Sequence, residues 1–167
     1  TGSSADYRDL GGLLGALKGL SDQRRRDAID RLEAASGPMP GGIVFAPMAP
    51  SEVRALAAAG HEVGSHTESH PILPKMSQSG IAAELRRSRR KIADWTGDLP
   101  AGFCYPNGSV DDGVRAEVIE SGYGYACTTR AVVNGVRADP YLLGRRMIAP
   151  ASTTTSRGGH SDAMFSA

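Results

Sequence analysis

The sequence predicts an α/β fold, and three observations support this prediction. After residue 50, segments with helical periodicity alternate with short extended segments, in the order helix, strand, helix, strand, helix, strand. Alternation of this kind is typical of parallel strands joined by helical crossovers. The length of 167 residues suits one domain, and a hydrophobic content of 40% is enough to form its core.

The segments of the alternating part are bounded by turn and capping residues. Ser51 is expected to cap the first helix, and Gly60 and Gly97 are expected to end helices. The carboxyl ends of parallel strands meet at one edge of a sheet, so residues that follow the strands should lie close together. The expected elements are helix 51–59, extended segment 61–65, a helix from Ser77 or Ser79 to about Trp95, strand 101–105, a helix from about residue 111 to 121, strand 123–129 and strand 142–148.

Two helices are expected before the alternating part. Leucines at helical spacing predict a helix over residues 7–20, and a second helix is expected over 23–35, with Ile29 and Leu32 facing inward. A connection with four prolines and three glycines follows at 36–50. The predicted organisation is a helical hairpin insert with a linker (1–40), a partial α/β domain (41–150) and a flexible tail (151–167) rich in Ser, Thr and Gly.

The overall composition excludes some function classes. With 19 basic and 18 acidic residues, the net charge is +1, so no strong field attracts nucleic acid or an acidic membrane. No apolar run is long enough to span a bilayer. Cys104 and Cys127 fall in two predicted strands. We expect two buried free thiols, with a disulfide between neighbouring strands as the alternative.

The most informative segment is His66-Thr67-Glu68-Ser69-His70, which Pro71 closes. Two imidazoles four residues apart can converge on one metal ion, and this step falls within the usual spacing of zinc ligands. A turn, Tyr105-Pro106-Asn107-Gly108, ends a neighbouring predicted strand. The histidine pair and this turn should therefore open onto the same rim of the sheet.

These segments resemble the motifs of a known family. Gly60 to Thr67, together with Ser69-His70-Pro71, resembles the second motif of polysaccharide deacetylases of the NodB-homology type. Phe103 to Gly108 is similar to their third motif, and Gly122-Tyr123 with 126–129 is similar to the next strand. The resemblance covers about residues 48–148, and residues 7–35 resemble a helical insert that some members carry.

The resemblance implies a distorted (β/α) barrel and removal of acetyl groups from a polysaccharide, by N- or O-deacetylation. It implies a divalent metal, which we expect to be zinc, with cobalt or nickel as alternatives, and His66 and His70 as its ligands. Thr67 is expected to orient a neighbour or contact substrate. The backbone N–H of Tyr105 is implied as the oxyanion donor. Three residues, Pro106, Asn107 and Gly108, would shape the wall of the substrate groove.

The family's first motif, which carries two aspartates, is absent from the sequence. The resemblance assigns the catalytic base and the third metal ligand to these aspartates. We therefore expect a barrel that is incomplete at its N-terminus and a chain that is weakly active or inactive in isolation. A non-catalytic carbohydrate-binding or scaffolding relative is the alternative. An extracellular or cell-envelope location follows only from the implied substrate, and no oligomeric state is predicted.

Overall fold

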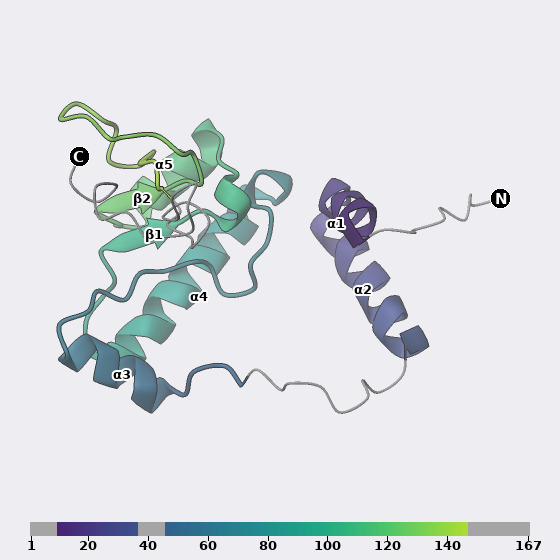
Figure 1. The fold of residues 1–167 in the computed structure, drawn as a ribbon, viewed down its shortest axis with the longest axis horizontal. Helices are drawn as coiled ribbons and strands as arrows, with labels where there is room; N and C mark the ends of the chain where they lie inside the picture. The colour runs from purple at the N-terminus through teal and green to yellow at the C-terminus, as the bar shows by residue number, and fades with distance from the viewer. Residues whose placement is uncertain (1–9, 37–45, 147–167) are drawn as a thin grey trace, which may run out of the picture.

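The computed structural model describes residues 10–36 and 46–146 (Figure 1). The expected tail at 151–167 and most of the expected linker lie outside the described residues. The elements are α1 (Leu10–Gly19), α2 (Asp22–Ser36), α3 (Pro50–Ala58), η1 (Leu73–Lys75), α4 (Gln78–Thr96), β1 (Gly102–Cys104), η2 (Pro106–Gly108), α5 (Asp112–Glu120) and β2 (Tyr125–Cys127).

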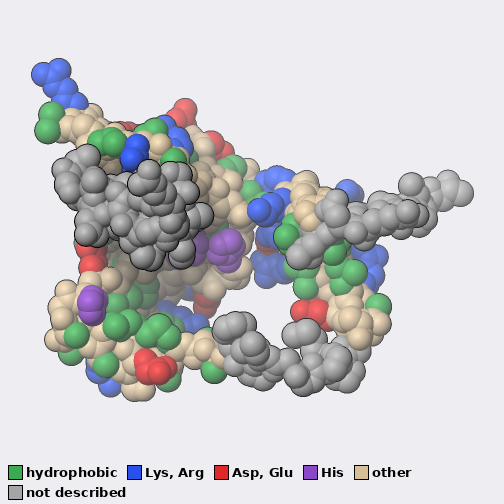
Figure 2. Space-filling view, in the orientation of Figure 1, with side chains coloured by type: hydrophobic (Ala, Val, Ile, Leu, Met, Phe, Trp, Pro, Cys, Tyr) green, Lys and Arg blue, Asp and Glu red, His purple; other side chains and the backbone are tan. Residues whose placement is uncertain are grey.

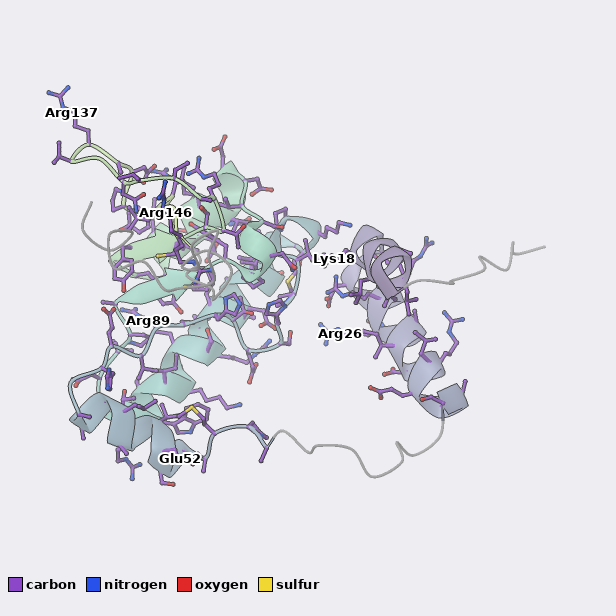
Figure 3. All side chains as sticks on the ribbon, in the orientation of Figure 1. Lys18, Arg26, Glu52, Arg89, Arg137 and Arg146 are labelled. Atoms are coloured by element: carbon purple, nitrogen blue, oxygen red, sulfur yellow. The ribbon has the colours of Figure 1, made fainter. Side chains whose placement is uncertain are left out.

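Capping residues set the ends of the helices close to where the sequence predicts them. The hydroxyl of Ser77 accepts a hydrogen bond from the N–H of Gly80 at the start of α4, and Gly97 ends this helix with φ +91°. Helix α3 begins at Pro50, so the prediction that Ser51 caps it is wrong. Ala49 is the N-cap instead, and its N–H donates to the carboxylate of Glu52 (2.6 Å), which Figure 3 labels at this end of the helix.

The sheet confirms the predicted α/β class. Strands β1 and β2 are parallel, with Phe103 opposite Ala126. Single parallel bridges, Ser65 to Phe103 and Cys127 to Leu143, flank the two strands. The expected strands at 61–65 and 142–148 therefore contribute one bridge each within the described residues, because only one residue of each segment lies in register. The described sheet has two strands and does not close, so the structure does not confirm the barrel.

The core lies between the sheet and the helices α4 and α5. Phe103 packs edge-to-face on Tyr105, with ring centroids 5.2 Å apart. On α5, Val118 is buried in this core, whereas the neighbouring Ile119 is 39% exposed. The buried cluster consists of Leu73, Ile81, Leu85, Phe103, Tyr105, Val114, Val118, Tyr123 and Ala126.

Three tyrosine hydroxyls connect the strand ends to the helices through backbone carbonyls. Tyr105 donates to the carbonyl of Tyr141 (2.9 Å), and Tyr141 donates to the carbonyl of Tyr123 (2.9 Å). Tyr123 in turn donates to the carbonyl of Leu85 on α4 (3.2 Å). Burial raises the pKa of Tyr105 to about 12, so its phenol remains a proton donor at neutral pH.

The hairpin of α1 and α2 lies beside the main body (Figure 1). The Lys75 ammonium of the main body donates a hydrogen bond to the backbone carbonyl of Lys18 in the hairpin. The prediction that Ile29 and Leu32 face inward is wrong, since they are 37% and 46% exposed. Helix α2 buries none of its residues, because it packs on α1 only along a short stretch.

Cys104 and Cys127 are register partners on β1 and β2, and both thiols are free. The expectation of free thiols is confirmed, but both residues are half-buried rather than buried, because the described sheet leaves this face partly open. Burial raises the pKa of the Cys127 thiol, and the nearby Cys104 adds to this shift. Within the described residues, no helix is both long enough and apolar enough to cross a membrane.

Candidate metal and active site

His66 and His70 lie close together in the loop that follows the Ser65 bridge. Their ring centroids are 4.8 Å apart, and the rings meet edge-to-face at 76°. Two imidazoles that share a zinc ion, each with a Zn–N distance of about 2.0 Å, have ring centroids about 5 Å apart. The separation in this loop therefore fits two ligands of one metal ion.

A backbone carbonyl fixes the tautomer of His66. Its Nδ1 lies 2.7 Å from the carbonyl oxygen of Cys104, the last residue of β1. A carbonyl only accepts, so Nδ1 carries the proton in this bond, and in the neutral imidazole Nε2 then has the free lone pair. Metal-binding histidines usually donate their other ring N–H to an acceptor that does not itself touch the metal, and this bond orients the ring. The donor set of the loop thus fits a divalent transition metal, and His66 is oriented before any ion binds.

The loop backbone adopts conformations that are uncommon for non-glycine residues. Thr67 has φ +67° and His70 has φ +55°. The Thr67 hydroxyl donates to the carbonyl of His66 and accepts from the N–H of His70 (3.0 Å). Thr67 therefore joins the backbone of both histidines, and its hydroxyl is engaged within the loop. Strain of this kind persists only where the surrounding contacts hold it.

Glu84 holds the backbone of the histidine loop, and the sequence analysis did not identify this residue. It lies on α4 and is 2% exposed. Its carboxylate accepts from the N–H groups of Glu68 and Ser69, both at 2.9 Å, and from the Ser69 hydroxyl at 2.9 Å. Burial favours the neutral acid, but the bonds from Ser69 and Glu68 and the charge of Arg87 outweigh it, and the pKa of Glu84 lies below its ordinary value.

The position of Glu84 in the sequence does indicate that its carboxylate is buried. It falls three residues after Ile81 and one before Leu85, on the apolar side of the predicted helix. An acidic side chain in this place needs buried partners, since an unpaired buried charge is costly. The sequence alone does not tell which donors meet it, because they lie 15 and 16 positions away in a loop.

Two further contacts attach the loop to α4. Arg87 pairs with Glu84 at 3.2 Å and also with Glu68, which lies between the two histidines. The hydroxyls of Ser65 and Ser88 are 2.8 Å apart in the interior, just before the loop begins. The histidine loop is therefore held by charge and hydrogen bonds along one face of a single long helix.

The turn at 105–108 lies on the same rim as the histidines, because the carbonyl that His66 contacts belongs to Cys104. In this structure the backbone N–H of Tyr105 donates to the Cys127 carbonyl (3.1 Å) and is not free. The ring of Pro106 is buried, whereas Asn107 is exposed and has φ +56°. Of the predicted groove residues, Asn107 thus presents its side chain to solvent, and Pro106 supports the turn from within.

Replacing Gly108 with alanine is expected to destabilise the turn. A Cβ at this position would lie 2.1 Å from the Thr129 hydroxyl and 2.8 Å from the Thr129 nitrogen, and the residue has φ +70°. We expect Gly108→Ala to lower the free energy of unfolding by about 1–3 kcal/mol in urea titrations. The control is Gly135→Ala, because nothing lies within 4 Å of a Cβ there. Equal stability of the two variants would contradict this steric account.

The candidate metal site is incomplete within the part of the chain that the structure describes. No group of three or more His, Cys, Asp and Glu side chains in residues 10–36 and 46–146 is placed to hold an ion. The described residues thus supply two ligands from one loop.

Comparison with known proteins identifies the family. The model of the polysaccharide deacetylase family matches residues 25–126, which is more than half of the chain. The chain belongs to the polysaccharide deacetylase family. This confirms the resemblance drawn from the histidine loop and the Tyr-Pro-Asn-Gly turn. The match begins at residue 25, inside α2. It therefore includes part of the segment 1–40, which the sequence analysis interprets as an insert with its linker.

Individual polysaccharide deacetylases are similar over part of their length. Chitin deacetylase 1 of Cryptococcus neoformans is 39% identical over 64 residues, which is 38% of this chain and 14% of that protein. The peptidoglycan-N-acetylglucosamine deacetylase PgdA of Listeria monocytogenes is 32% identical over 69 residues, 41% of this chain and 15% of that protein.

A solved structure supports the fold. A polysaccharide deacetylase from Bacillus cereus superposes with a TM-score of 0.54 at 29% identity, over 62% of this chain and 33% of that one. The chain therefore aligns with about a seventh of these two enzymes and with a third of this solved structure.

Proposed function

We propose that this chain is part of a metal-dependent hydrolase that removes acetyl groups from a polysaccharide. The observation that carries the proposal is the histidine pair. Its rings are 4.8 Å apart, and the Cys104 carbonyl holds His66 with Nε2 available for a metal. Membership of the polysaccharide deacetylase family supports the reaction class. Zinc is the proposed ion, since imidazole nitrogen suits it well.

Each residue of the rim has a proposed role. The bound ion would polarise the acyl oxygen and acidify a water molecule, as divalent metals do in hydrolases. His66 and His70 would hold the ion, and Thr67 and Glu84 would keep the loop that carries them in place. Asn107 would contact the sugar from the exposed side of the turn.

The proposed oxyanion donor is the backbone N–H of Tyr105. This group donates to Cys127 in the structure, so it would serve the substrate only after that bond is exchanged. The phenol of Tyr105 is not the base, because its pKa of about 12 keeps it protonated and its hydroxyl bonds to Tyr141. We propose that the third metal ligand and the catalytic base are carboxylates from outside the described residues.

Metal binding and acetate release test this proposal together. Cobalt absorption spectra and zinc calorimetry should show saturable binding with one ion per chain. Acetate release from acetylated chitin oligomers (amides) and acetylated xylan (esters) should be slow and should stop when a chelator is added. Absence of saturable binding would overturn the metal site. Fast turnover by the isolated chain would refute the expectation that this chain is weakly active or inactive in isolation. Binding of both sugars with no acetate release would favour a non-catalytic carbohydrate-binding relative.

A further inference from the structure

A basic groove lies along α4, beside the histidine loop. We call it the α4 groove, and it has a volume of about 380 Å³. Four basic and two acidic side chains line it. The lining residues are Glu68, Ala83, Arg86, Arg87, Arg90, Lys91 and Asp94. The chain as a whole has a net charge of only +1, so this excess of positive charge is a local feature of the surface.

The four cations of the groove divide into two kinds. Arg87 and Lys91 already face the carboxylate of Glu68, and Lys91 also lies 5.7 Å from the centre of the Trp95 ring. Arg86 and Arg90 are exposed, and neither makes a hydrogen bond or ion pair with another described residue. They are four residues apart and therefore share one side of the helix, about 6 Å apart along its axis.

The groove and the histidine loop share a residue. Glu68 lies between His66 and His70 in sequence, and its carboxylate forms part of the groove wall. Arg26 of α2 lies near α4, since it interacts electrostatically with Glu84 and Arg87, and its guanidinium group is paired with Asp22. Figure 3 shows Arg26 on the side of the hairpin that faces the main body, and Figure 2 shows basic side chains there, next to a purple histidine patch.

We propose that the α4 groove binds a carboxylate-bearing stretch of the polysaccharide while an acetylated sugar lies at the histidine pair. This inference rests on the proposed function and narrows it to an acidic polysaccharide. Charge complementarity supports it: two guanidinium groups that have no partner among the described residues, one helical turn apart, match carboxylates on successive sugars of an extended chain. The Glu68 carboxylate, held by Arg87 and Lys91, shows that the groove already accommodates this group.

Two polymers with one backbone and different charge test the proposal. Polygalacturonate carries carboxylates, and its full methyl ester is neutral. We expect the 167-residue chain to bind polygalacturonate in affinity electrophoresis or calorimetry at about 0.02 M salt and to lose this binding at about 0.5 M salt, because screening weakens exposed ion pairs. The methyl ester should bind at least about tenfold more weakly.

A double variant assigns the binding to this groove. Arg86→Gln with Arg90→Gln should weaken polygalacturonate binding about tenfold or more. Arg24→Gln with Arg137→Gln, which removes the same charge from exposed positions outside the groove, should leave binding near that of the parent chain. Circular dichroism spectra should be the same for both variants, since all four side chains are on the surface.

The possible results separate this inference from the proposed function. Equal binding of the ester, or equal loss in both double variants, would overturn the groove assignment. Polyphosphate that binds as tightly as polygalacturonate, with the same dependence on Arg86 and Arg90, would overturn the choice of carboxylate. Zinc binding should be unchanged by Arg86→Gln with Arg90→Gln. A chain that binds polygalacturonate through the groove but binds no zinc would refute the proposed function and leave the groove standing.

Discussion

Replacing His66 with alanine is expected to lower the affinity for zinc at least about 100-fold. The variant removes one of two imidazoles whose centroids are 4.8 Å apart, and the remaining His70 would hold the ion alone. Loss of a group that only hydrogen-bonds to a metal ligand costs about 10–100-fold in metal affinity, so loss of a ligand itself should cost at least as much. His70→Ala should have the same effect. Competition titrations with a chromophoric chelator measure both.

The matched control for these variants is His61→Ala. His61 is also exposed, but it lies five residues before His66, at the start of the extended segment 61–65. Five extended residues separate the two histidines by about 16 Å. The purple histidine side chains accordingly form two separate patches in Figure 2. Zinc affinity should be unchanged in this variant. Retention of full zinc affinity in His66→Ala, or an equal loss in His61→Ala, would contradict a site at the 66–70 loop.

Glu84→Ala is expected to lower both the stability and the zinc affinity. The substitution leaves the N–H groups of Glu68 and Ser69 without their acceptor and Arg87 without one of its partners. Loss of a buried charged acceptor of this kind should cost about 2–4 kcal/mol in the free energy of unfolding. The loop would then lose its fixed shape, and zinc affinity should fall about 10–100-fold. Urea titration and zinc calorimetry measure the two effects.

Two further variants test whether Glu84 acts by positioning the loop. Glu84→Gln keeps a carbonyl oxygen of the same reach, so it should recover part of both losses. Asp94→Ala removes an exposed acid from the same helix and should change the free energy of unfolding by less than about 0.5 kcal/mol. Zinc affinity unchanged in Glu84→Ala, at a temperature where the variant is folded, would show that Glu84 supports the fold and not the metal site.

The sequence predicts the helices of this chain well, because their signals are local. Ser77 and Gly97 bound α4, and Asp111 caps α5 through the N–H of Val114. The strands are less well predicted. The segments at 61–65 and 142–148 read as strands but contribute one bridge each in the described residues, because pairing depends on register with distant neighbours and not on local propensity.

The inward faces of helices are predictable only where a partner is present. Val114 and Val118 lie in the core, since α5 packs against α4. Ile29 and Leu32 have the same apolar periodicity, but they are exposed because α1 meets α2 only along a short stretch. A hydrophobic pattern thus defines a face of a helix and leaves open what lies against it.

By itself, the sequence determined the family, the two candidate ligands and the turn that accompanies them, because these are short segments whose residue types and spacing carry the chemistry. The tertiary structure alone decided how the histidine loop is held. The Cys104 carbonyl on His66 and the Glu84 carboxylate on the loop backbone join residues 38 and 15–16 positions apart. Contacts of this range depend on how α4 and β1 pack, which no local pattern specifies.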